Sequence, residues 1–172
     1  MAACTPEPPN EDEILASAQS LPAPQPGLYR STTRLTDYDL PLASPQEATA
    51  MRARLDGMAP SVAEHCLSAA EAEEGWLALV EGLNEGTCRI ERFSAESGEM
   101  EASVACTGPG EMTSRMALRG TATTTSSAMD LRIVQQGPAI PGGEQTIAMA
   151  ITSERVGECT VPAPGPSPIA GG

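Results

Sequence analysis

Residues 88–106 read CRIERFSAESGEMEASVAC, and this stretch decides the fold. The segment AESGE at 95–99 is typical of a hairpin turn, so we expect Ser94 to face Met100 across it. Moving away from the turn in steps of two gives the other facing pairs: Arg92 with Ala102, Ile90 with Val104, and Cys88 with Cys106. The pattern therefore predicts two antiparallel strands with a cysteine at the far end of each.

The two faces of this predicted hairpin differ in polarity. Ile90 and Val104 share the face of the two cysteines, whereas the opposite face carries Arg89, Glu91, Ser103 and Glu101. Such alternation is typical of strands that pack one face on a core. Facing residues of antiparallel strands lie about 4.5 to 5.5 Å apart at Cα, a distance that suits a disulfide. We therefore predict a bond between Cys88 and Cys106.

The chain has five cysteines, and four of them lie between residues 66 and 159. These four lack the Cys-x-x-Cys spacing of zinc and redox sites. With Cys88 and Cys106 paired, Cys66 remains to bond Cys159, which would tie the segment after the first strand to the last strand. Two disulfides indicate an oxidising compartment outside the cytosol.

Alternation with a period of two continues on both sides of the hairpin. Strands are expected over 27–40, 111–121, 129–133 and 147–151, separated by turns rich in glycine, proline, serine and threonine. A capping box at Ser44–Glu47 predicts a helix to about Asp56. A second box at Ser68–Glu71 predicts a helix that carries Trp76 and is ended by Gly82 and Gly86. Residues 61–67 are expected to form a short turn. The fold class is thus a β-rich α+β fold, an antiparallel meander sheet with two or three short helices inserted after the first strand.

The N-terminal segment is similar to the junction at which bacterial lipoproteins are processed. Ala2-Ala3-Cys4 has the shape of a lipobox, in which the cysteine is lipidated, although Cys4 could instead be a free thiol. Prolines follow, and Asn10–Glu13 has the composition of a helix start. We divide the chain into a lipobox remnant and proline-rich tether (1–26), a disulfide-bonded domain (27–160) and a disordered Pro/Gly tail (161–172).

Composition excludes several classes of function. The chain has 10 Lys plus Arg against 23 Asp plus Glu, a net charge of −13, so nucleic acid is not an expected partner. No apolar run approaches the roughly 20 residues that span a bilayer. Attachment to the membrane would therefore come from lipid on Cys4. Because Thr5 is not Asp, the sorting pattern of related lipoproteins favours a periplasmic protein at the outer membrane.

The candidates for chemistry each have a simpler explanation. His65 is the only histidine, so a triad or imidazole metal site would have to use it, and its neighbour Cys66 is needed for a disulfide. Clustered methionines could bind Cu(I), but they occupy apolar positions and are better explained as core. A two-carboxylate hydrolase is a distant third possibility. We therefore expect no enzyme activity, no cofactor and no metal site.

Four segments resemble a known bacterial envelope family. They read PGLYRST at 26–32, CLS at 66–68, CTGPGEM at 106–112 and RVGEC at 155–159. Together with the cysteine spacing, they are similar to the family catalogued as domain of unknown function 3617, although that family often has Trp where Tyr29 stands. The resemblance implies an exported, disulfide-bonded β domain and no particular activity.

The expected function is the binding of a small apolar ligand or an envelope protein through the sheet. The ligand-facing candidates are the methionines in the strands and the one tryptophan: Met112, Met116, Met129, Met149 and Trp76. The alternative is a structural or interaction module whose own helices fill the sheet face.

Overall fold

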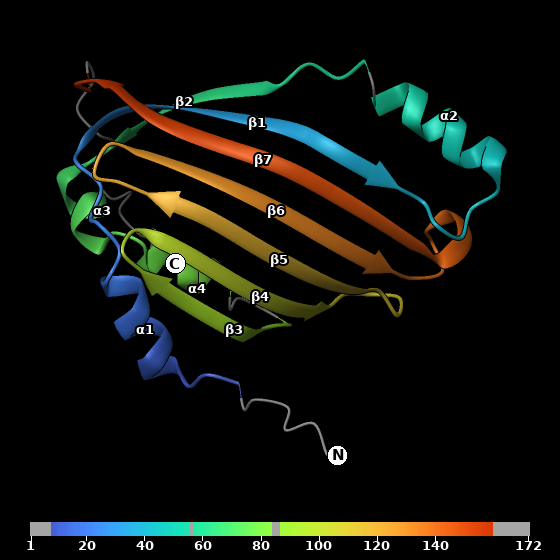
Figure 1. Cartoon of the computed structure of the whole chain (residues 1–172), viewed down its shortest axis with the longest axis horizontal. Helices are drawn as coiled ribbons and strands as arrows, with labels where there is room; N and C mark the ends of the chain where they lie inside the picture. The colour runs from blue at the N-terminus through green and yellow to red at the C-terminus, as the bar shows by residue number, and fades with distance from the viewer. Residues whose placement is uncertain (1–7, 56, 84–86, 160–172) are drawn as a thin grey trace, which may run out of the picture.

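The computed structural model describes residues 8–55, 57–83 and 87–159, in which seven strands form one antiparallel sheet (Figure 1). The strand order is β2-β1-β7-β6-β5-β4-β3. The bounds are β1 Gly27–Asp39, β2 Ser61–Leu67, β3 Cys88–Glu96, β4 Glu99–Thr107, β5 Thr113–Ala122, β6 Ser126–Gln136 and β7 Glu144–Gly157. Strands β3 to β7 form the predicted meander, because each pairs with the next along the chain.

In the described residues four helices accompany the sheet, and three of them lie between β1 and β3 as predicted. Their bounds are α1 Glu11–Gln19, α2 Pro45–Leu55, α3 Ala69–Glu74 and α4 Leu77–Leu83, with a short 3₁₀ turn at Pro141–Gly143. Helices α1 and α4 contact each other and β3, whereas α2 contacts β1 near the other end of the sheet (Figure 1). The β-rich α+β class predicted from the sequence is confirmed.

The hairpin of β3 and β4 follows the predicted register at the cysteines and departs from it near the turn. Cys88 faces Cys106 and Ile90 faces Val104 as expected, but a bulge then shifts the pairing by one residue. As a result Phe93, and not Arg92, faces Ala102. The predicted pairs Arg92–Ala102 and Ser94–Met100 are wrong, because the bulge places two residues opposite one and turns the only phenylalanine into the core.

The turn of this hairpin is also tighter than the predicted five-residue loop. Glu96 pairs with Glu99, which leaves only Ser97 and Gly98 between the strands. Both residues have positive φ, of 54° and 83°, as two-residue hairpin turns matched to strand twist require.

Two predicted elements between β1 and β3 are corrected. Residues 61–67 form an edge strand rather than a turn, because they pair with β1. The local sequence pattern did not indicate this pairing. The predicted single helix from Ser68 is broken into α3 and α4 at Gly75, whose φ of 60° ends α3. Gly82 lies inside α4 rather than ending it, and Gly86 lies outside the described residues.

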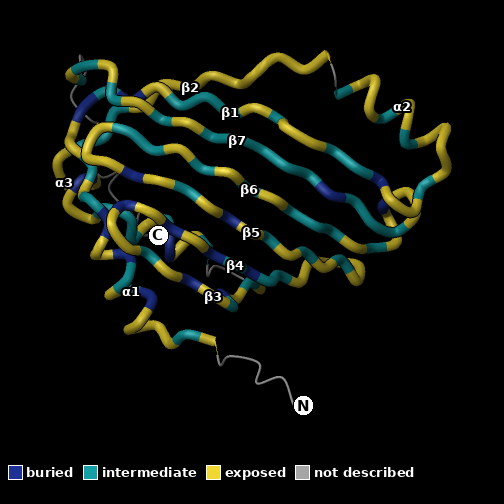
Figure 2. Tube along the Cα trace, in the orientation of Figure 1, coloured by how far each residue is buried: buried dark blue, intermediate teal, exposed yellow. Residues whose placement is uncertain are grey.

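The main core cluster is concentrated at β3, β4 and β5 (Figure 2), and the register places its strand residues on one face of the sheet. Met100 and Val104 of β4 are its most completely buried large side chains. Helix α1, in the segment that we assigned to a tether, adds Ile14 and Ala18 to the same cluster. By contrast, no described residue of β6 is fully buried.

Both predicted disulfides are confirmed. Cys88–Cys106 closes the open end of the β3–β4 hairpin. Cys66–Cys159 joins the edge strand β2 to the segment just after β7, with β1 between these strands. Each bridge therefore secures a strand at an edge of the sheet.

Substituting Gly27 by alanine should lower the free energy of unfolding by about 1 to 3 kcal/mol. Gly27 has a φ of 148°, and a Cβ there would lie 2.6 Å from the carbonyl oxygen of Gly157. The matched control is Gly57→Ala, where a Cβ would have no neighbour within 4 Å. Urea unfolding should leave this control within about 0.5 kcal/mol of the parent. Equal stability of both variants would contradict the close approach of β1 and β7.

Candidate functional site

The inner face of the sheet, which carries the core, continues past the helices as a half-buried apolar surface. On β6 and β7 the side chains of this face form three facing pairs: Met129 with Ile151, Leu131 with Met149, and Ile133 with Ile147. We call these six residues the apolar strip. All six are half-buried, because α1 and α4 lie against β3 rather than over these strands.

A cavity of about 270 Å³ opens at one end of the apolar strip. Trp76 and Leu79 line one side of it, and Met129, Ile151 and Tyr29 line the other. We call it the Trp76 pocket. It is the place where the helical insert meets the strands β1, β6 and β7, and most of its wall is apolar.

The position of Trp76 depends on the break between α3 and α4. Gly75 reverses the chain with a positive φ, and Trp76 follows it directly before α4 begins. The indole Nε1 donates a hydrogen bond of 2.9 Å to the carbonyl oxygen of Pro22. With its one polar atom satisfied, the indole presents apolar surface to the pocket.

Several polar side chains at the rim have hydrogen-bond partners. The Tyr29 hydroxyl donates to the carbonyl oxygen of Gln25 at 2.8 Å, and the Ser31 and Ser153 hydroxyls are 3.0 Å apart. Burial raises the pKa of Tyr29, while the nearby charge of Arg155 opposes this shift. Tyr29 is therefore a neutral wall residue at physiological pH. With several of its polar groups already hydrogen-bonded and most of its wall apolar, the pocket offers mainly apolar contact.

The predicted ligand-facing residues separate into three groups. Trp76 and Met129 line the pocket together, and Met116 and Met149 lie on the same inner face beside Val104 and Leu131. Met112 is elsewhere: it precedes β5, and its side chain packs against Gly137. The proposed lipidation site Cys4 lies outside the described residues.

Ile151, Tyr29 and Leu79 are among the pocket residues that sequence reasoning missed. Ile151 was recognisable, because it shares the phase of Met149 on the last strand. Tyr29 and Leu79 come from elements far apart in the chain, and only the packing of the helical insert brings them together. His65, considered earlier as a catalytic candidate, lies at the rim with its ring stacked on Tyr29 at a centroid distance of 5.7 Å.

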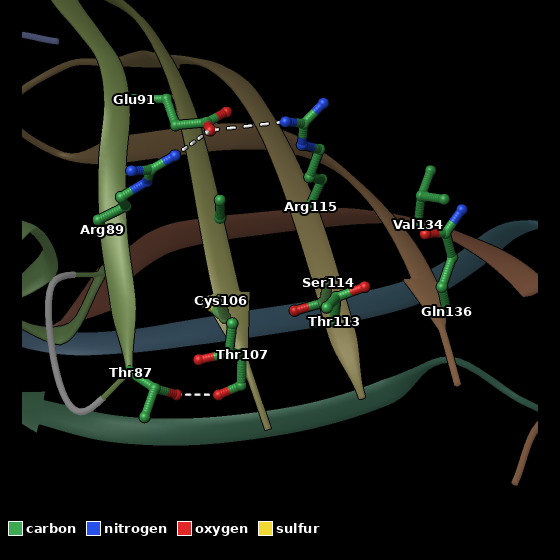
Figure 3. A pocket seen from close by; sticks show the side chains of 11 residues that line it. Thr87, Arg89, Glu91, Cys106, Thr107, Thr113, Ser114, Arg115, Val134 and Gln136 are labelled. Atoms are coloured by element: carbon green, nitrogen blue, oxygen red, sulfur yellow. Dashed lines mark hydrogen bonds and ion pairs between the residues drawn. The ribbon is translucent and has the colours of Figure 1, made fainter. Parts of the chain in front are cut away.

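The outer face of the sheet holds a second, more polar hollow of about 710 Å³ (Figure 3). Arg89 of β3 and Arg115 of β5 approach it from either side, and both point an Nη2 atom at the same oxygen of Glu91. The two distances are 3.4 and 3.7 Å. In the part of the chain that the structure describes, no group of three or more His, Cys, Asp or Glu residues is arranged to hold a metal ion.

A model of a known protein family matches most of the chain. The model described as "Protein of unknown function (DUF3617)" matches residues 24–159, which include all four disulfide cysteines. The chain belongs to the DUF3617 family. No curated protein and no solved structure matches this DUF3617 protein. In the described ranges, none of the helices has both the length and the apolar character needed to cross a membrane.

Proposed function

We propose that this DUF3617 protein is a non-enzymatic cell-envelope lipoprotein that binds an acyl chain in the Trp76 pocket and along the apolar strip. The observation that supports this proposal is the continuity of the two surfaces. Met129 and Ile151 line the pocket and also form the first pair of the strip. A chain that enters the pocket therefore has an apolar surface to follow.

The dimensions suit a medium-length acyl chain. From Ile147 to Ile151 the strip covers four residue steps, about 13 Å of strand. Burying a methylene group contributes about 0.8 kcal/mol, so eight of them contribute roughly 6 kcal/mol before the cost of association is subtracted. This balance supports weak, reversible binding.

The proposed location follows from the cysteines and the N-terminal segment. The two disulfides fit an oxidising periplasm, and lipid on Cys4 would hold the domain at the membrane, where acyl chains are abundant. The sorting argument from Thr5 favours the outer membrane. Mass spectrometry of the protein from bacterial membranes tests this part, since a diacylglycerol-sized mass on Cys4 is the expected result.

Titration with dodecanoic acid should change the fluorescence emission of the full-length protein in a saturable way. Trp76 is the only tryptophan, so the signal reports directly on the pocket. Ile151→Asp should weaken binding by at least about tenfold, because an acyl chain would have to desolvate the new carboxylate. The matched control is Val156→Asp, a 41 % exposed position on the same strand and outside the pocket, which should bind like the parent.

Two results would overturn acyl-chain binding. One is an unchanged emission spectrum up to the solubility limit of dodecanoic acid, with no lipid in native mass spectra of the purified protein. The other is equal weakening by both aspartate variants, provided that circular dichroism shows both to be folded. Either result would favour the alternative, a module that binds an envelope protein through the sheet.

A further inference from the structure

The outer face of the sheet carries a cluster of arginines at one end of β3 to β6, while Glu101 and Asp130 lie in the row beyond it. All ten basic residues of the chain are arginines, against 23 acidic residues. Arg89, Ala105 and Arg115 are successive neighbours across β3, β4 and β5. The next row of facing residues on the same face runs from Arg92 through Ser103 and Ala117 to Arg132. Four arginines therefore share two adjacent rows, in which Glu91 is the one carboxylate across β3 to β6.

The arginines at the hollow are held apart by a small residue. Ala105 lies between Arg89 and Arg115, and its methyl group leaves the space between their longer side chains open. Figure 3 shows the guanidinium groups reaching toward Glu91 from opposite sides. Each guanidinium carries five N–H donors, so one shared carboxylate oxygen uses only a small part of their capacity.

Neutral donors border the same space. Thr87, Thr107 and Thr113 are each two residues from a position in the arginine row, so they lie on the same face and line the hollow. The Thr87 hydroxyl donates to the carbonyl oxygen of Thr107. Two guanidinium groups with hydroxyl groups beside them are the arrangement that recognises carboxylate and phosphate oxygens.

We propose that this hollow binds a small oxyanion, a carboxylate or phosphate group held between Arg89 and Arg115. Glu91 occupies the guanidinium groups when the ligand is absent and competes with the ligand. Its side chain is 25 % exposed, whereas those of Arg89 and Arg115 are 73 % and 75 % exposed. The arginines can therefore turn toward a ligand while Glu91 stays close to the sheet.

The net charge of the protein limits the affinity without abolishing the site. At physiological salt the Debye length is about 8 Å, so distant carboxylates are screened and the nearby arginines dominate. Because both arginines are mostly exposed, each contact is worth little by itself, and weak binding is expected. The site is independent of the Trp76 pocket, since the two lie on opposite faces of the sheet.

The experiment measures calorimetric binding to the full-length protein in separate arms with inorganic phosphate, acetate, and vesicles of phosphatidylglycerol or of phosphatidylcholine. At least one anionic probe should bind saturably, and Arg89→Ala and Arg115→Ala should each weaken it about threefold to fivefold, the effect of losing one solvent-exposed charged contact. Glu91→Gln should strengthen binding severalfold by removing the competing charge. The control is Arg52→Ala in α2, where the exposed arginine pairs with Asp39 away from the hollow. This variant should bind like the parent.

The Glu91→Gln variant separates ligand binding from a merely structural ion pair, because a structural role predicts lower stability and no gain in affinity. Binding of phosphate or acetate identifies a soluble ligand, and arginine-dependent binding of phosphatidylglycerol vesicles alone identifies a lipid headgroup. The proposal is overturned if no anionic probe binds, if the Arg89 and Arg115 variants behave like Arg52→Ala, or if Glu91→Gln does not bind more tightly. Trp76 emission should not respond to phosphate, so failure here leaves the test with dodecanoic acid unaffected.

Discussion

Replacing Cys66 and Cys159 together by serine should lower the free energy of unfolding by about 4 to 5 kcal/mol. The bridge closes a loop with a sequence separation of 93 residues, and without it the unfolded chain gains the entropy of that loop. Cys88 and Cys106 are only 18 residues apart. Their double serine variant should lose less, about 3 kcal/mol, because a shorter loop constrains the unfolded chain less.

Urea unfolding followed by Trp76 emission and by circular dichroism measures both losses. The parent protein treated with reductant serves as a control, since it lacks both bridges at once. If the short-loop variant proves the less stable of the two, chain entropy is not the main contribution of these bridges. Edge strand β2 pairs only with β1, so hydrogen exchange should show faster exchange along β2 first in the Cys66 and Cys159 variant.

Phe93→Ala should lower the free energy of unfolding by about 3 to 5 kcal/mol, because it leaves a cavity in the main core. Phe93 is 8 % exposed and lies on β3, the strand that α1 and α4 contact. Phe93→Leu keeps much of the volume and should cost less than about 1.5 kcal/mol. The same urea experiment measures all of these variants.

The neighbouring variant Arg92→Ala tests the bulge itself. In the observed register Arg92 is exposed and its loss should change stability by less than about 0.5 kcal/mol. A regular hairpin without the bulge would place Arg92 on the inner face and Phe93 on the outer one. Similar losses for Arg92→Ala and Phe93→Ala would therefore contradict the register described here.

Much of the fold could be predicted from local patterns. Alternation with a period of two identified the strands of the meander, and the capping boxes at Ser44 and Ser68 located the starts of α2 and α3, because these signals depend on neighbours only a few residues away. Counting residues from the turn was sufficient to pair Cys88 with Cys106. The one-residue error in the turn cancelled against the bulge, so the prediction held at Cys88–Cys106 and Ile90–Val104 and failed between the bulge and the turn.

The candidate sites were harder to predict from local sequence patterns. Trp76 and Met129 were selected for their residue types, but their meeting in one pocket depends on the break at Gly75 and on how the insert packs. The arginine pair was missed, since Arg89 and Arg115 are neighbours only through the register of β3, β4 and β5.

By itself the sequence determined the class of the fold, the alternation of its strands, the disulfide partners and the membership of the DUF3617 family, because these follow from residue type and spacing. Only the tertiary structure decided that residues 61–67 form an edge strand, that Phe93 turns inward and that part of the inner face stays uncovered. These features depend on contacts between segments that are far apart in the chain, and the free energies of such contacts cannot be deduced from a local sequence pattern.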